Sequence, residues 1–248
     1  MLLGGMVKNS TLDYPSRLSC VIFTRGCNFH CPYCHNPALV PRPAAKKEGP
    51  LGAMEEPISS PDPSEALAFL KKRQGLLDGV VLSGGEPSLQ DLGELRAFLG
   101  ALKKMGYPVK LDTNGSRPEV IEALLKELLV DYLAVDVKAP PGRYPSSLAE
   151  PAEAAGVEET IALALDFQRR GKIRCEFRTT CFSPVIDETA VMLIASSLKG
   201  SATLYLQEVR PETVLSPGLV EKAGPQPSKA LLRLWAAKAS AHLPCVAR

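Results

Sequence analysis

The chain has 248 residues, 45% of them hydrophobic, and its formal net charge is +2 at pH 7. This length and composition suffice for one large domain with a substantial core, and the near balance of charge gives no indication of a nucleic-acid or membrane partner. The chain has no apolar run of about 18 residues and an odd number of cysteines, seven, which argues against a membrane span and a secreted disulfide framework. We therefore expect a soluble, cytoplasmic protein.

From residue 18 onward, apolar runs typical of buried parallel strands alternate with amphipathic helical patterns. The expected strands cover residues 18–24, 79–82, 108–111, 132–137, 173–179 and 202–209. Signals for the start of a helix follow most of these strands, at Asp62, Ser88, Ser116, about Val157, Asp187 and Ser228.

Six strand–helix units in one chain predict a parallel sheet with right-handed crossovers. Residues 1–17 and the Pro/Gly-rich segment 41–63 lie outside these units. An α/β fold with an open, partial (β/α)6 TIM-like barrel and outer helices therefore fits better than a closed eight-unit barrel. A doubly wound open sheet is the structural alternative. We expect residues 1–248 to form a single domain, with 1–17 as an N-terminal segment and 41–63 as a surface insert.

Three cysteines, Cys27, Cys31 and Cys34, follow the first predicted strand within eight residues. Protein-bound iron–sulfur clusters are held by cysteine thiolates, normally four. Three thiolates at this spacing can hold three irons of a four-iron cluster and leave the fourth iron open to a small molecule. A zinc site that also uses His30 or His35 is the alternative, although no second Cys-x-x-Cys or histidine pair follows in the chain.

Polar residues gather where the other predicted strands end, and in a parallel barrel these ends carry the reactive groups. Taken alone, Gly84-Gly85 is typical of a tight turn, and Asp136 with Lys138 could form a simple ion pair on one strand face. Taken together, these residues predict a pocket for an amino-acid head group, with Glu86 accepting from an ammonium and Lys138 pairing with a carboxylate. The segments concerned are 83–87, 112–115, 136–138, 178–180 and 207–210.

These residues resemble the radical S-adenosylmethionine superfamily. Its signature C-x-x-x-C-x-aromatic-C is present as Cys27, Cys31, Tyr33 and Cys34, and its G-G-E-P motif is present at 84–87. The segments 10–15, 26–29 and 34–37 look like activating enzymes for glycyl radical proteins, most of all the branch that activates anaerobic ribonucleoside-triphosphate reductase. The similarity extends from about residue 6 to residue 210.

The resemblance implies a [4Fe-4S] cluster on the three cysteines and S-adenosylmethionine bound at the open iron. One electron would cleave the cofactor to methionine and a 5′-deoxyadenosyl radical, which would take a hydrogen atom from a glycine of a partner enzyme, with flavodoxin or ferredoxin as the electron donor. The implied cofactor contacts are Tyr33 and His35 near the adenine, Gly84, Gly85 and Glu86 at the methionine amine, and Asp112, Asp136 and Lys138 around the methionine carboxylate. Asp13 would face the partner's glycine segment.

Two positions depart from the family pattern, because Arg25 stands where glutamine is frequent and Arg210 where formate-lyase activases have histidine. Two other functions remain as alternatives. One is a radical S-adenosylmethionine synthase acting on a small molecule, of the deazaguanine-synthase type. The other is a metal-binding interaction protein without activity, and the set Glu86, Asp112, Asp136 and Lys138 argues against it.

Overall fold

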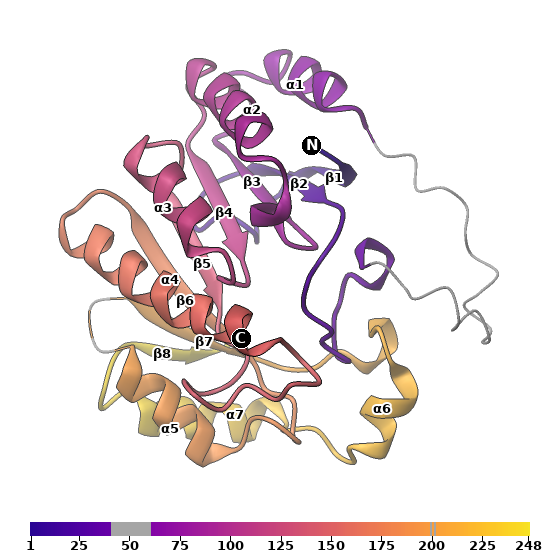
Figure 1. Cartoon of the computed structure of the whole chain (residues 1–248), viewed down its shortest axis with the longest axis vertical. Coiled ribbons are helices and arrows are strands. Elements are labelled where there is room, and N and C mark those ends of the chain that lie inside the picture. Colours follow the sequence, from indigo (N-terminus) through magenta and orange to yellow (C-terminus); the bar gives the residue numbers. More distant parts are fainter. Residues whose placement is uncertain (41–60, 199, 201) are drawn as a thin grey trace.

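A computed structural model of the chain describes residues 1–40, 61–198, 200 and 202–248. These residues form an eight-stranded sheet whose strands lie side by side in sequence order (Figure 1). The strands are β1 (Leu3–Ser10), β2 (Ser19–Thr24), β3 (Gly79–Gly84), β4 (Val109–Thr113), β5 (Tyr132–Asp136), β6 (Arg174–Thr180), β7 (Thr203–Gln207) and β8 (Cys245–Ala247). Strand β1 is antiparallel to β2, and every later pair is parallel. The sheet is open, as predicted for a partial barrel.

Helices cover the outer face of the sheet (Figure 1). They are α1 (Pro63–Lys71), α2 (Leu92–Lys104), α3 (Pro118–Lys126), α4 (Pro151–Arg169), α5 (Glu188–Ser197) and α7 (Lys229–Ala239). The short helix α6 (Pro217–Lys222) lies apart from them (Figure 1), and the Ser216 N–H at its start donates to the Pro32 carbonyl at 2.9 Å. Short 3-10 turns occur at Pro37–Leu39, Pro87–Leu89 and Pro211–Thr213. Helix α2 illustrates the packing, because Leu95, Leu99 and Leu102 recur at helical spacing and are fully buried. None of the helices in the described ranges combines the length and apolar character needed to cross a bilayer.

The two faces of the sheet differ in chemistry because successive side chains of a strand point to opposite faces. In β4, Val109 and Leu111 belong to the large apolar core under the helices. The intervening Lys110 is also buried, although it carries a charge. Glu176 of β6 is likewise buried, between Cys175 and Phe177 of the apolar core. The inner face of the sheet therefore holds buried charges, and these charges lie below the site described next.

All six predicted strands are present, with ends that differ by up to a few residues. The sequence pattern missed β1, since two glycines and exposed residues interrupt its apolar character, and it missed β8, which is only three residues long. Helix α2 starts at Leu92 rather than at Ser88, because the Asp91 side chain accepts from the Glu94 N–H and caps it there. Helix α4 starts at Pro151, ahead of the expected Val157. The greater part of the predicted insert, 41–60, lies outside the described residues.

Candidate functional site

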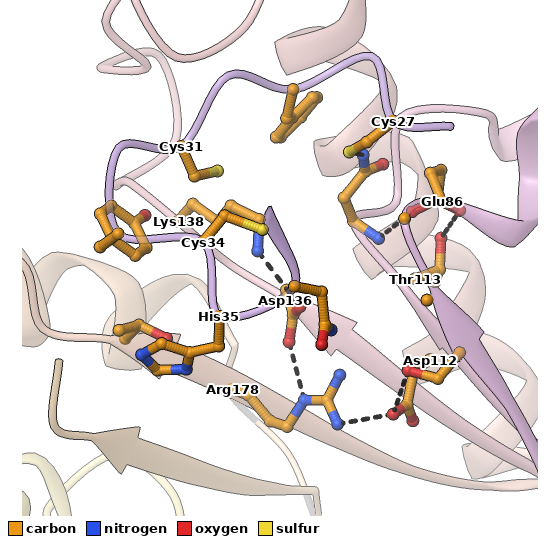
Figure 2. Close-up of a pocket in the computed structure, with 18 of the residues that line it drawn as sticks. Cys27, Cys31, Cys34, His35, Glu86, Asp112, Thr113, Asp136, Lys138 and Arg178 are labelled. Atoms are coloured by element: carbon orange, nitrogen blue, oxygen red, sulfur yellow. Dashed lines mark hydrogen bonds and ion pairs between the residues drawn. The ribbon is translucent and has the colours of Figure 1, made fainter. Parts of the chain in front are cut away.

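A cavity of about 370 Å³ lies at the carboxyl ends of the parallel strands (Figure 2). It brings together every residue that the sequence predicts for the site, although these residues come from the carboxyl ends of four parallel strands, β2 to β5, and the loops after them, and from the loop between β1 and β2. The predicted residues that line it are Asp13, Cys27, Cys31, Tyr33, Cys34, His35, Gly84, Gly85, Glu86, Asp112, Asp136 and Lys138. The cavity falls within the size range of small-molecule and cofactor sites.

The three thiols lie on the loop that follows β2. The backbone holds this loop through Gly26 N–H donating to the Leu39 carbonyl at 2.9 Å and Cys34 N–H donating to the Cys31 carbonyl at 3.1 Å. Figure 2 shows the Cys27 thiol on the side of Glu86, and the Cys31 and Cys34 thiols on the side of Lys138.

Burial raises the pKa of Cys27 to about 12 and that of Cys31 to about 11, and it also raises the pKa of Cys34. In the metal-free protein these thiols are therefore protonated at neutral pH, and metal binding must release their protons. Within the described ranges, no three His, Cys, Asp or Glu side chains converge on a point where one ion could sit. In a four-iron cluster each thiolate binds a different iron, so that convergence is not required of the cysteines.

Two glycines let the loop after β3 pack directly on the cysteine loop. A Cβ atom at Gly85 would lie 1.9 Å from the Gly26 carbonyl oxygen, and one at Gly84 would lie 2.3 Å from the Thr24 nitrogen. Gly84 also has a positive φ of 122°, which glycine adopts most readily. The Glu86 N–H donates to the Gly26 carbonyl at 2.7 Å and so links the two loops by a backbone hydrogen bond. These glycines therefore fix the position of the cysteine loop by backbone packing.

Glu86 is fully buried, and its carboxylate accepts four hydrogen bonds. One oxygen accepts from Ser88 N–H at 3.0 Å, Ser88 hydroxyl at 2.6 Å and Thr113 hydroxyl at 2.7 Å, and the other accepts from Asn114 N–H at 2.6 Å. Burial raises the pKa of Glu86, and these hydrogen bonds oppose the rise. The carboxylate therefore links the loop after β3 to the loop after β4. This structural role is additional to the contact with an amine that the sequence analysis predicts for Glu86.

A chain of ion pairs crosses the floor of the cavity (Figure 2). The Lys138 ammonium lies 3.1 Å from Asp136, and the Arg178 guanidinium lies 2.7 Å from Asp136 and 3.0 Å from Asp112. Asp112 is also paired with the buried Lys110 at 2.5 Å. Although burial raises the carboxyl pKa values, the neighbouring cations outweigh it and hold the pKa of both aspartates below the usual range.

Arg178 is a site residue that the sequence analysis did not assign. A strand arginine is ordinarily solvated, and only the sheet places this one between two carboxylates of neighbouring strands. The signal in the sequence was its spacing of two from Glu176, which puts both on the inner face. Ser83, Thr113 and Asn114 also line the cavity and were not assigned individually.

The two residues expected near an adenine are held differently. The Tyr33 ring is buried against Phe182, with 4.9 Å between ring centroids. Among the buried polar side-chain atoms of the described residues, the Tyr33 hydroxyl is the one without a hydrogen-bond partner. His35 accepts from the Arg210 backbone N–H at 3.1 Å, and burial lowers the pKa of His35, so the ring is neutral and able to accept at pH 7.

Asp13 lies at the edge of the cavity, on the loop between β1 and β2, where the Ser10 hydroxyl donates to its carboxylate. The neighbouring Leu12 side chain is 87% exposed. Four carboxylates and two cations line the cavity apart from the thiols, which gives a formal charge of −4 + 2 = −2. This charge favours a cationic ligand.

Comparison with known proteins matches residues 21–195 to the Radical SAM superfamily model. A Methanocaldococcus jannaschii protein named for glycyl-radical enzyme activation is 36% identical over 85% of this chain and 81% of its own length. The 7-carboxy-7-deazaguanine synthase of Methanopyrus kandleri is 34% identical over 46% of this chain and 47% of its own length. The solved structure of native anSMEcpe with bound AdoMet has a TM-score of 0.55 at 15% identity and covers 90% of this chain and 61% of its own, a likeness of fold alone.

Proposed function

Since the chain belongs to the radical S-adenosylmethionine superfamily, we propose that it is an activating enzyme that generates a glycyl radical in a partner protein. Enzymes of this superfamily use a [4Fe-4S] cluster together with S-adenosylmethionine. The observation that carries the proposal is the relative named for glycyl-radical enzyme activation, which aligns along 85% of the chain. We also propose that residues 1–248 form a single domain.

The residues of the cavity fit both groups. Three thiols and no competing histidine pair form a donor set suited to iron–sulfur chemistry. The cavity carries formal negative charge, and S-adenosylmethionine is a cation at its sulfonium and its ammonium. The buried Tyr33 hydroxyl lacks a protein partner in the described structure, so a bound ligand could supply one.

We assign the cluster to Cys27, Cys31 and Cys34, and the methionine part of the nucleotide to the floor of the cavity. There the Lys138 ammonium can receive the methionine carboxylate without leaving Asp136, because an ammonium has three donors. We assign Asp112 and Asp136 to the surroundings of the same carboxylate, where Asp136 holds the Lys138 ammonium in place and Arg178 links the two aspartates.

The adenine is assigned to the neighbourhood of Tyr33 and His35. Gly84, Gly85 and Glu86 form the wall beside the amine, with Glu86 holding the loops in place. We assign Asp13, at the edge of the cavity, to the incoming glycine segment.

When bound, the reduced cluster would supply a one-electron cleavage of the sulfonium to methionine and a 5′-deoxyadenosyl radical, which would take a hydrogen atom from the glycine Cα to give 5′-deoxyadenosine and a glycyl radical. The chain's own contribution is position and exclusion of water: buried side chains close the floor, and fixed ion pairs orient the methionine head.

We further propose that the partner is an anaerobic ribonucleoside-triphosphate reductase, with flavodoxin or ferredoxin as the electron donor. The support is the set of segments at 10–15, 26–29 and 34–37, together with an open sheet that leaves room for a partner's loop. Free cysteines and an oxygen-sensitive centre suit the reducing cytoplasm.

A second candidate is a synthase that uses the same radical on a small molecule. It is favoured by the relative named 7-carboxy-7-deazaguanine synthase, although that match covers only 46% of this chain. The two candidates differ in the substrate that receives the radical, so they can be separated directly.

The test uses anaerobically reconstituted, reduced protein with S-adenosylmethionine and the candidate reductase. A glycine-centred radical signal by electron paramagnetic resonance is expected, and Asp13→Ala should lose that signal while still cleaving the nucleotide without a partner. Glu119→Ala, a surface carboxylate on the outer helix α3, is the matched control and should behave as wild type. Cleavage that no protein partner changes but that a small metabolite accelerates would instead favour the synthase.

A further inference from the structure

The side-chain amide of Asn114, on the loop after β4, directs its nitrogen toward the Cys27 thiol. The Nδ2–Sγ distance is 3.9 Å, within the range of a hydrogen bond to sulfur. The orientation of the amide follows from its partners, because its oxygen accepts from the Ser116 N–H at 2.9 Å. The nitrogen must therefore face the acceptors on the other side, which are the Cys27 sulfur and the side-chain amide oxygen of Asn28, the latter at 3.0 Å.

A second layer of hydrogen bonds fixes this arrangement. The Asn28 amide nitrogen donates to the Ser116 hydroxyl and to the Glu153 carboxylate, each at 2.9 Å. The Asn114 backbone N–H donates to Glu86 at 2.6 Å. Asn114 is buried, so its amide has few other partners within reach. The Asn114 amide that faces the sulfur is thus held by contacts from the cysteine loop, from the loop after β3 and from the first turn of α4.

Cys27 differs from the other two thiols in its charged neighbours. At Cys31 and Cys34 the largest effect of a nearby charge comes from the Lys138 ammonium, whereas at Cys27 that of the Glu86 carboxylate exceeds that of Lys138. Negative charge added to the Cys27 sulfur is therefore not balanced by a dominant cation, and Asn114 is a neutral donor that can stabilise it.

We propose that Asn114 is a positioning residue that donates an N–H···S hydrogen bond to the Cys27 thiolate and thereby raises the reduction potential of the cluster. Hydrogen bonds to the sulfurs are among the factors that set the potentials of iron–sulfur clusters. The added electron increases the negative charge on iron and sulfur, so a donor to sulfur favours the reduced form. The inference rests on the proposed role of Cys27 as a cluster ligand.

The test is a redox titration of the reconstituted protein without S-adenosylmethionine, in which the reduced cluster is measured by electron paramagnetic resonance. Asn114→Ala and Asn114→Asp should both shift the potential to more negative values, with the larger shift for the aspartate because it also adds a charge. A shift of 59 mV corresponds to a tenfold fall in the ratio of reduced to oxidised cluster at a fixed potential. Asn9→Ala is the control, since it removes an asparagine side chain from the exposed part of β1, and its potential should equal that of wild type.

Iron content separates the failure of this inference from the failure of the proposed function. Wild-type protein that binds no four-iron cluster would refute the proposed function itself. Variants that keep their iron and their wild-type potential would overturn the role of Asn114 alone. A further measurement uses wild-type protein with ¹⁵N in the asparagine side-chain amides, where pulsed electron paramagnetic resonance should detect a nitrogen coupling. Absence of that coupling would overturn the inference even if neither variant retained iron.

Discussion

Replacement of Arg178 by methionine should lower the free energy of unfolding by about 3 kcal/mol near pH 7. Removing one partner of a buried ion pair costs about 3–5 kcal/mol, because the remaining charge stays buried without compensation. The Arg178 side chain is 13% exposed and contacts two carboxylates, Asp112 and Asp136. The lower end of the range applies because Lys110 and Lys138 still pair with those carboxylates in the variant.

The measurement is urea unfolding of the metal-free, reduced protein, followed by circular dichroism. A loss of about 3 kcal/mol corresponds to a fall in Tm of about 6–12 °C for a chain of this size. Arg96→Met is the matched control, since Arg96 pairs with Glu127 at 2.6 Å but is 43% exposed. Exposed pairs contribute roughly 0–1 kcal/mol, so the control should change little. Equal changes below 1 kcal/mol in both variants would refute the account of the buried charges.

The same reasoning gives a pH dependence. In the folded chain the pKa values of Asp112 and Asp136 are held below their usual range, whereas an unfolded aspartate has a pKa of about 3.9. Groups with a lowered folded pKa contribute stability that is present above the unfolded pKa and is lost as the pH falls toward the folded pKa. Wild-type stability should therefore fall below about pH 4 more steeply than that of Arg178→Met. If the difference in free energy of unfolding between wild type and Arg178→Met stays constant from pH 7 down to about pH 3.5, the pairing of Arg178 with the two aspartates is contradicted.

Three further predictions concern the glycine packing, the cluster and the nucleotide. Gly85→Ala should destabilise the protein by about 1–3 kcal/mol and reduce iron retention, because the added Cβ would meet the Gly26 carbonyl. The control is Gly100→Ala inside α2, whose Cβ would meet no atom and which should stabilise the protein by roughly 0.5–1 kcal/mol. Equal changes in the free energy of unfolding for the two variants in urea would argue against the close approach of the loops. Cys31→Ala should abolish the visible absorption and the bound iron of the reconstituted protein, and full iron content would remove Cys31 from the ligand set. Lys138→Ala should weaken S-adenosylmethionine binding by about 1.5–3 kcal/mol in equilibrium dialysis, and unchanged binding would place the methionine carboxylate elsewhere.

Local patterns in the sequence were sufficient for much of the fold. The apolar runs at 79–82 and 132–137 are recognisable as buried strands, and proline and acidic caps mark the helices between them. The pattern failed where an element depends on its neighbours rather than on its own residues. Strand β1 is interrupted by glycines and forms because β2 offers an antiparallel edge, and β8 is three residues that pair with β7.

The site shows the same division. Cysteine spacing, the ends of the predicted strands and the resemblance to a known family together selected the three cysteines and the residues around Gly84, Asp112 and Asp136. The sequence did not indicate that the Glu86 carboxylate would accept hydrogen bonds from Thr113 and Asn114, because these two donors come from the end of β4 and the loop after it.

The one-dimensional pattern therefore determined which chemical groups this protein carries and at which strand ends they lie. The tertiary structure decided what each group faces. Arg178 is buried between two aspartates, and Asn114 directs an amide at Cys27, only because parallel strands bring residues far apart in the chain to one edge of the sheet. Contacts across strands depend on register and burial, and these are properties of the packed sheet rather than of any local segment.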